Sequence, residues 1–176
     1  MLQAHPTDPT LVYFDLYSHG EPIRMLFAVA KKPFVDKRIS MEEWPALKAS
    51  GQLPFGSLPV VIGGQNAGYQ EIMCQKLAIL RGFGSMFGYY PKDSMKSDLL
   101  WRIDSVVELC VDSISALAGS FMKQPSKTDF DVVYKKTVSN WFKIMDGRLS
   151  KNPTGCPFAA GTETPTIADF YVVSFL

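Results

Sequence analysis

The sequence contains only three cysteines and two histidines, and neither set forms a chemical motif. Cys74, Cys110 and Cys156 are odd in number and widely spaced, which excludes a disulfide framework and a cysteine-based metal site. His5 and His19 lack the spacing of zinc ligands, so we expect no metal. A reducing, cytoplasmic compartment is the simplest explanation of this cysteine usage.

Long apolar runs and an excess of one charge are also absent. The formal net charge is +1, which provides no basic field for nucleic acid or for an anionic membrane surface. No apolar run is long enough to predict a transmembrane segment. Residues 1–9 lack the features of a signal or transit peptide, and we expect them to form a flexible tail. The 176 residues are 47% hydrophobic and 20% charged, which is typical of globular proteins.

Two kinds of periodicity divide the chain into a mixed part and a helical part. In the first part, strand patterns occur at 11–16, 34–39, 60–62 and 69–73, and helical patterns occur at 21–30, 40–47 and 75–87. Pro22 suits the first turn of its helix, and Ser40 with Glu43 forms a capping box. The order β-α-β-α-β-β-α predicts a small α/β domain over residues 1–88.

After a linker at 89–95, apolar residues recur only at helical spacing. Two long helices have the stripes Leu99, Ile103, Val106, Cys110, Ile114, Leu117, Phe121 and Phe130, Tyr134, Val138, Trp141, Met145, Leu149. We expect Thr128 with Asp131 to cap the second helix, and Thr166 with Asp169 to cap a third that runs to Leu176. Because the third helix is apolar nearly all round, we expect a missing segment or another chain to cover it. Residues 96–176 are therefore predicted to form an all-helical domain that is incomplete at its C-terminus.

The stretch from Leu53 to Gly64 joins a loop rich in proline and glycine to a β-branched strand. Pro59 opens the apolar run, a position where strands tolerate proline, and the Leu58–Pro59 bond is a candidate for the cis form. A rigid loop at a sheet edge leaves the Leu58 backbone available to an extended, peptide-like ligand. An ordinary junction between loop and strand is the alternative interpretation.

These segments together resemble the cytosolic glutathione transferases, most closely the sigma-like branch with its glutathione-dependent prostaglandin D synthases and S-crystallins. The resemblance is carried by residues 11–14, 21–24, 43–48, 53–61, 74–81 and 166–171. It implies a thioredoxin-like domain followed by a helical domain, in a homodimer. It also implies that the protein uses glutathione as co-substrate, for conjugation to a small hydrophobic electrophile or for isomerisation of such a compound.

The resemblance also assigns roles to individual residues. A thiol with an ordinary pKa of about 8.5 is a poor nucleophile until it ionises, and the Tyr13 hydroxyl would stabilise the glutathione thiolate. Leu58 would pair through its backbone with the cysteinyl part, beside a cis Pro59. Trp44 and Lys48 lie four residues apart on one helix face and would reach the glycine end.

The remaining assignments include two departures from the family pattern. Gln75 and Lys76 would hold the γ-glutamyl carboxylate at a helix start, and Asp112 of the partner subunit would reach the γ-glutamyl amine. Lys76 replaces the usual serine or threonine, and His19 replaces an arginine near the catalytic tyrosine. Because histidine is mostly neutral at pH 7, we expect weaker thiol activation. Val111 replaces an acidic residue of the metal-binding members, which again predicts no metal.

Other interpretations stay open. Tyr13 and Trp44 also suit structural aromatic positions, Lys48 suits a solvated surface, and the thiol of Cys74 is either activated by a helix start or buried and inert. A non-catalytic scaffold or interaction subunit is the alternative function, and an apolar third helix that invites a protein partner favours it. A thiol oxidoreductase would need a cysteine between Tyr13 and His19, where none occurs.

Overall fold

The protein, in a computed structural model, is described for residues 2, 5–64, 71–92, 96–123 and 126–176, with Thr128 described by its backbone only. These residues divide into two compact units, Met1–Gly88 and Tyr89–Leu176. The first unit has strands and helices and the second has helices, so the prediction of an α/β part followed by a helical part is confirmed.

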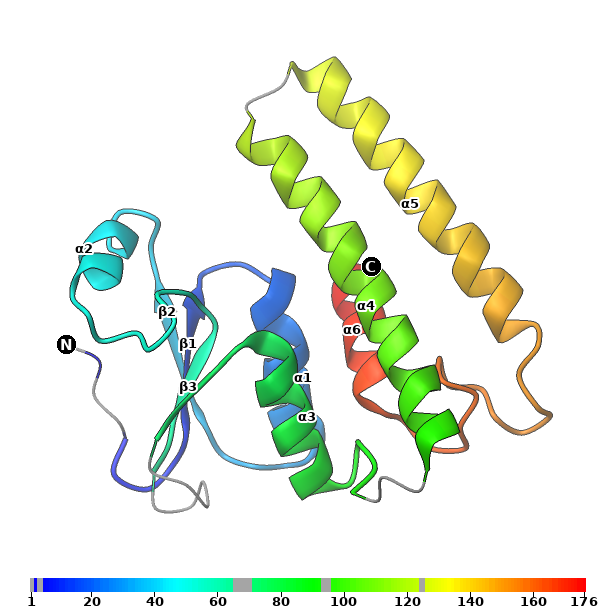
Figure 1. The fold of residues 1–176 in the computed structure, drawn as a ribbon, viewed down its shortest axis with the longest axis horizontal. Coiled ribbons are helices and arrows are strands. Elements are labelled where there is room, and N and C mark those ends of the chain that lie inside the picture. Colours follow the sequence, from blue (N-terminus) through cyan, green and yellow to red (C-terminus); the bar gives the residue numbers. More distant parts are fainter. Residues whose placement is uncertain (1, 3–4, 65–70, 93–95, 124–125) are drawn as a thin grey trace. The chain divides into compact units, whose positions relative to one another are not determined.

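The first unit is built on a mixed sheet of four strands (Figure 1). Its elements are β1 (Thr10–Phe14), η1 (Ser18–Gly20), α1 (Glu21–Val29), β2 (Val35–Ile39), α2 (Trp44–Ala49), β3 (Val60–Ile62), β4 (Ile72–Cys74) and α3 (Lys76–Phe87). The strand order is β2-β1-β3-β4, with β1 parallel to β2 and antiparallel to β3. The return strand β4 starts at Ile72, and the predicted turn at 65–68 lies outside the described residues.

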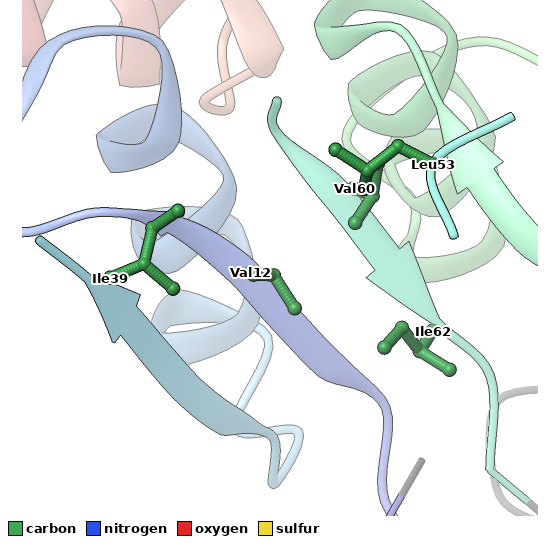
Figure 2. Close-up of a cluster of buried hydrophobic side chains, with 5 residues drawn as sticks. All are labelled: Val12, Ile39, Leu53, Val60 and Ile62. Carbon is green, nitrogen blue, oxygen red and sulfur yellow. The ribbon is translucent and has the colours of Figure 1, made fainter. Parts of the chain in front are cut away.

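The two faces of the sheet carry different groups because side chains alternate along a strand. On one face, Val12 of β1 joins a cluster of five buried residues, each at most 6% exposed (Figure 2). Trp44 and Leu47 of α2 pack against this cluster. By this alternation Tyr13 points to the opposite face. The helices α1 and α3 lie side by side on that face (Figure 1). Full burial of one such apolar side chain contributes about 1.5–3 kcal/mol.

Part of the segment expected to be a flexible tail contacts the first unit. Leu2 packs against the cluster of Figure 2, and its N–H donates to Gln52 Oε1 at 2.6 Å. A Cβ on Gly64, just after β3, would lie 2.8 Å from the carbonyl oxygen of Asp8 and 2.9 Å from that of His5. The chain therefore runs along the end of β3 before it enters β1.

The second unit consists of α4 (Ser97–Met122), α5 (Lys127–Leu149) and α6 (Ile167–Phe175), with α4 packed against the other two. Its core contains side chains from all three helices: Ile103, Val106, Val107, Cys110, Trp141, Met145, Ile167, Phe170 and Tyr171. The predicted stripes are wrong at their ends, since Phe121, Tyr134 and Leu149 are exposed. Phe121 meets the Phe130 ring edge-on and Tyr134 stacks on the same ring, at centroid distances of 6.2 and 6.1 Å.

The cap of α5 lies earlier than predicted. Ser126 is the N-cap, and its hydroxyl accepts a hydrogen bond from the Asp129 N–H at 3.2 Å. The prediction of Thr128 with Asp131 is therefore wrong, because the helix already begins at Lys127. The sequence contains two overlapping patterns of hydroxyl residue and carboxylate, and the first one forms the cap.

The cap of α6 is confirmed and also holds the preceding loop. Asp169 Oδ2 accepts from the Thr166 N–H at 2.7 Å, and the Thr166 hydroxyl accepts from the Ala168 N–H at 3.3 Å. Asp169 Oδ1 accepts from the Ala159 N–H at 2.8 Å. The helix is not buried all round, since its outer residue Val173 is 54% exposed.

One helix in the described part of the chain, α4, is long and apolar enough to cross a membrane by length and composition alone. Its mean hydropathy over 18 residues is 1.4, which corrects the expectation that no segment would meet this criterion. A core helix meets the same criterion, and α4 buries Ile103, Val106 and Cys110 within the helical unit.

Candidate functional site

Tyr13 lies near the end of β1 with its ring held in a fixed place. The side chain is only 5% exposed, and its ring meets Phe14 edge-on at a centroid distance of 5.4 Å. The Arg24 guanidinium carbon lies 6.0 Å from the Tyr13 centroid. The backbone of Gly20 is so close that an added Cβ would lie 2.3 Å from Tyr13 Cδ1. Among the described residues, no hydrogen bond to the Tyr13 hydroxyl is found, so a ligand can take that bond.

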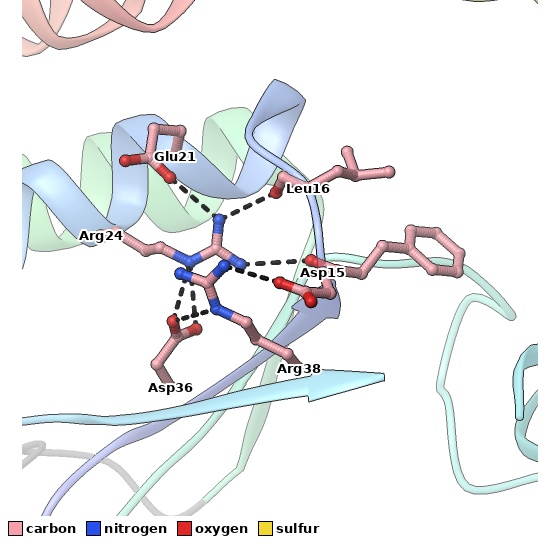
Figure 3. A network of polar contacts seen from close by, with 7 residues as sticks. Asp15, Leu16, Glu21, Arg24, Asp36 and Arg38 are labelled. Carbon is pink, nitrogen blue, oxygen red and sulfur yellow. Dashed lines mark hydrogen bonds and ion pairs between the residues drawn. The ribbon is translucent and has the colours of Figure 1, made fainter. Parts of the chain in front are cut away.

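The turn after β1 is held by Arg24 of α1, which is 6% exposed (Figure 3). Its Nε donates to both carboxylate oxygens of Asp36, at 3.0 and 3.1 Å. Its Nη1 donates to Glu21 Oε2 and to the Leu16 carbonyl, both at 3.0 Å, and its Nη2 donates to the Phe14 carbonyl at 3.3 Å. Because carboxylates pair with this buried charge, the arginine fixes the segment between Tyr13 and α1.

Arg38 of β2 extends this network at the surface (Figure 3). Its Nη1 donates to Asp15 Oδ1 at 2.7 Å and its Nε to Asp36 Oδ2 at 2.8 Å. Hydrogen bonds to Asp15 and Asp36 raise the pKa of Arg38 above its usual value. Such exposed ion pairs contribute little to stability, so the buried Arg24 carries the structural role.

His19 in η1 and Lys76 at the start of α3 are brought into electrostatic contact. Burial, and to a smaller extent the positive charge of Lys76, lower the pKa of His19 to about 4. The imidazole is therefore neutral at pH 7, as the sequence led us to expect. The buried His19 Nδ1 has no hydrogen-bond partner within the described ranges.

The start of α3 carries no side-chain cap. The helix begins at Lys76, one residue later than predicted, and Gln75 is its N-cap with φ 70° and ψ 109°. A positive φ is uncommon for a residue other than glycine and often marks a functional position. The first N–H groups of an uncapped helix are free to bind an anion.

The Leu58–Pro59 peptide bond is cis, as predicted. Pro59 is buried and Leu58 packs at the edge of the cluster of Figure 2. The next residue, Val60, pairs with Val12 of β1 and Cys74 of β4. In the part of the chain that the structure describes, the Leu58 backbone makes no hydrogen bond, so it can pair with an extended ligand.

Trp44 and Lys48 share one face of α2, as predicted. The Lys48 Nζ lies 5.7 Å from the centroid of the Trp44 ring, which in turn meets Phe14 edge-on at 5.4 Å. The Ser40–Glu43 bonds are also present, with the Ser40 N–H donating to Glu43 Oε2 at 2.7 Å. They form the turn that leads into α2, whose own N-cap is Glu43.

Comparison with known proteins decides the family. No protein-family model matches the chain. "Glutathione S-transferase 4" from Caenorhabditis elegans is 31% identical over 175 residues, which cover 94% of this chain and 77% of the relative. The chain belongs to the glutathione S-transferase family.

Two further glutathione S-transferase relatives agree with this conclusion. "S-crystallin SL11" from Nototodarus sloanii is 29% identical over 160 residues, which cover 88% of this chain and 72% of the relative. The structure of prostaglandin synthase D of Nilaparvata lugens superimposes with a TM-score of 0.77 at 25% identity and covers 96% of this chain and 79% of that one. The predicted fold, a thioredoxin-like domain followed by a helical domain, is confirmed.

The eight predicted site residues of the first unit lie on its strands, turns and helices as follows: Tyr13 in β1, His19 in η1, Trp44 and Lys48 on α2, Leu58 and Pro59 directly before β3, and Gln75 and Lys76 at the start of α3. Asp112 lies on α4 in the second unit, where its side chain is exposed. On the same helix, Asp104 accepts a hydrogen bond from the Tyr90 hydroxyl at 3.0 Å. Gly20, whose backbone lies against the Tyr13 ring, was not among the predicted site residues.

Two cysteines of this glutathione S-transferase fold, Cys74 and Cys110, lie where the thiolate form is disfavoured. Burial raises the pKa of the Cys74 thiol, despite its place before α3, and raises the pKa of Cys110 to about 11. All three cysteines are free. The described residues include no group of three or more histidine, cysteine or acidic side chains that could hold a metal.

Proposed function

We propose that the protein is a glutathione transferase in which the Tyr13 hydroxyl stabilises the glutathione thiolate. One observation carries this proposal: the Tyr13 ring is fixed by Gly20 and Phe14, while its hydroxyl has no partner in the described structure. A hydrogen bond that favours the charged form lowers a thiol pKa, and each unit corresponds to about 1.4 kcal/mol. The thiolate then attacks a small hydrophobic electrophile, either displacing a leaving group or starting an isomerisation.

Positive charge at this site comes from Lys76 rather than from residue 19. His19 is neutral, so it supports the thiolate by hydrogen bonding at most, whereas Lys76 is close enough to affect the pKa of His19. In our proposal Lys76 and the uncapped N–H groups that follow Gln75 bind the γ-glutamyl carboxylate.

The remaining contacts distribute glutathione over the first unit and across a homodimer. The Leu58 backbone, beside the cis Pro59, pairs with the cysteinyl part, and Trp44 and Lys48 receive the glycine end. Asp112 of the partner subunit reaches the γ-glutamyl amine. We further propose that the enzyme belongs to the sigma-like branch, acts in the cytoplasm in detoxification, and needs no metal.

The conjugation of 1-chloro-2,4-dinitrobenzene tests the role of Tyr13. Removal of a hydrogen bond to a charged group costs about 1.5–3 kcal/mol, so Tyr13→Phe is expected to lower kcat/KM about 10- to 100-fold. The pH–rate profile should shift to higher pH, with retention on immobilised glutathione unchanged. Tyr17→Phe is the matched control, since Tyr17 is 69% exposed in the same turn. Equal rates for the wild type and Tyr13→Phe would contradict the role of Tyr13.

A non-catalytic scaffold or interaction subunit is the second candidate. The neutral His19 favours it, as do the exposed apolar residues Val173 and Leu176 at the end of α6, which would suit a protein partner. If the protein is not retained on glutathione and its conjugation rate equals that of buffer, the scaffold is the better function. Retention with a rate that depends on Tyr13 rejects it.

A further inference from the structure

The helix α2 carries two of the proposed glutathione contacts, Trp44 and Lys48, but few contacts hold it to the first unit. It has six residues, none of them buried, and no side-chain hydrogen bond caps its start. Helices shorter than about 12 residues are unstable in water by themselves, so contacts from outside the helix must hold α2 in place. The position of Trp44 and Lys48 therefore depends on what supports this helix.

A hollow of about 320 Å³ lies between α2 and the edge strand β2. Of its described lining residues, all but one come from residues 37–52, the segment that runs from β2 through α2. The exception is Leu2, at the start of the chain. Leu2 also packs against the buried cluster around Val12. One side chain therefore belongs both to the packing of the sheet and to the wall of the hollow at α2.

A series of hydrogen bonds joins Leu2 to the last turn of α2. The Leu2 N–H donates to Gln52 Oε1 at 2.6 Å, and the Gln52 N–H donates to the Ser50 hydroxyl at 3.3 Å. That hydroxyl donates to the Leu47 carbonyl at 2.6 Å. Consecutive hydrogen bonds of this kind strengthen one another. The start of the chain is thus connected to the residue that directly precedes Lys48.

The residues between Leu2 and β1 that the structure describes are themselves anchored to the sheet. The His5 N–H donates to the Thr10 hydroxyl of β1 at 3.3 Å, and His5 Nδ1 accepts from the Asp8 N–H at 3.1 Å. An added Cβ on Gly64 would lie 2.9 Å from the His5 carbonyl oxygen, so the chain crosses the end of β3 without a gap. The support that Leu2 gives to α2 is therefore built on the sheet.

We propose that Leu2 is a positioning residue for the glutathione site. Its side chain and its N–H hold the last turn of α2 in the orientation in which Trp44 and Lys48 receive the glycine end of glutathione. This role rests on the proposed function, because α2 has a ligand to receive only if glutathione binds. Leu2 itself does not touch the ligand, so it acts on the affinity for the glycine end and not on the thiolate at Tyr13.

Two thiol substrates separate this role from a general loss of stability. Glutathione has the glycine end that α2 would receive, whereas γ-glutamylcysteine lacks it and keeps the other two groups. Leu2→Asn keeps the approximate size of the side chain but places a polar amide in the wall of the hollow, and Gln52→Met removes the acceptor of the Leu2 N–H. Each variant is expected to raise KM for glutathione about two- to tenfold, the range that corresponds to one net hydrogen bond.

The value of kcat with glutathione, and kcat/KM with γ-glutamylcysteine, should remain those of the wild type. The conservative variants Leu2→Met and Gln52→Glu should keep the wild-type KM, since the first retains an apolar side chain and the second an acceptor oxygen. Leu149→Asn is the matched control, because Leu149 is a partly exposed leucine of α5 in the second unit.

Hydrogen exchange without any thiol ligand tests Leu2 independently of glutathione binding. The amides of α2 should exchange faster in Leu2→Asn and Gln52→Met than in the wild type, while those of α1 and α3 keep their rates. Faster exchange of α2 together with a higher KM for glutathione alone supports the proposal. Wild-type exchange of α2 in both variants overturns it, as does an equal rise of KM for both thiols. A wild type without conjugation activity would overturn the proposed function as well, whereas an active wild type with unchanged variants would overturn the role of Leu2 alone.

Discussion

Replacement of Gly20 by alanine is expected to impair the proposed active site while Tyr13 itself stays unchanged. A Cβ on Gly20 would lie 2.3 Å from Cδ1 and 2.8 Å from Cγ of the Tyr13 ring. Ordinary contact begins near 3.4 Å, so the difference from 2.3 Å requires the ring or the turn to shift by about 1.1 Å. The φ of Gly20 is −82°, which alanine adopts easily, so the effect comes from the contact and not from backbone strain.

The Tyr13 ring has little room for this shift. It is 5% exposed and touches Phe14 on one edge, and the Arg24 network holds the turn that follows it. Forcing one extra carbon into such packing costs about 1–3 kcal/mol. A misplacement of about 1 Å at a reacting group can cost about 100-fold in rate. We therefore expect Gly20→Ala to lose about 1–3 kcal/mol of unfolding free energy and about 100-fold in kcat/KM.

Urea unfolding and the conjugation assay measure these two effects, with Gly119→Ala as the matched control. Gly119 lies within α4 with nothing within 4 Å of an added Cβ, so the same substitution should stabilise the protein by up to about 1 kcal/mol. The double variant Gly20→Ala/Tyr13→Phe should be no slower than the slower of the two single variants, because both act through one hydroxyl. Wild-type rate and stability in Gly20→Ala, or fully additive losses in the double variant, would refute the reasoning.

Two further predictions concern stability. Asp169→Ala removes the acceptor of the Thr166 and Ala159 N–H groups. It should lower the free energy of unfolding in urea by about 2–4 kcal/mol, whereas Asp131→Ala should change it by less than about 0.5 kcal/mol. Similar losses in the two variants would contradict the assignment of the α6 cap. The pKa of His19 is about 4 in the folded protein and about 6.5 in the unfolded chain, so the unfolded state binds the proton first and stability falls as pH falls from 6.5 to 4. The free energy of unfolding of His19→Gln should therefore depend less steeply on pH in this window. The difference in slope is at most about 1.4 kcal/mol per pH unit, and it is smaller because His19 is partly solvated. Equal slopes for the wild type and His19→Gln would show that His19 is not buried as a neutral group.

Elements with short-range signals could be predicted from the sequence. The strand β3 is a β-branched run between Pro59 and Gly63, and α6 starts at a capping box that also forms in the structure. The predicted N-cap of α5 was wrong because Ser126 and Thr128 each precede a carboxylate by three residues. Spacing alone does not show which of two overlapping patterns forms the cap. The prediction that Phe121 belongs to a buried stripe was wrong, because hydrophobic periodicity identifies an apolar helix face but does not show whether a neighbouring helix is long enough to cover it.

Those features of the candidate site that depend only on the local backbone or on spacing along one helix could be predicted from the sequence. The cis bond before Pro59 and the shared face of Trp44 and Lys48 are of this kind. The close approach of Gly20 to Tyr13 depends on how a turn folds back on a strand, and no spacing rule contains that information.

The Arg24 network also sets how much the length of the chain between β1 and α1 can vary. One planar guanidinium contacts oxygens of Phe14, Leu16, Glu21 and Asp36, which belong to a strand end, a turn, a helix start and a second strand. A lysine has a single ammonium group and could not span these directions. An inserted or deleted residue between Phe14 and Glu21 would move at least one carbonyl out of reach and leave a buried charge short of partners. The number of residues in this turn is therefore restricted by the reach of one side chain.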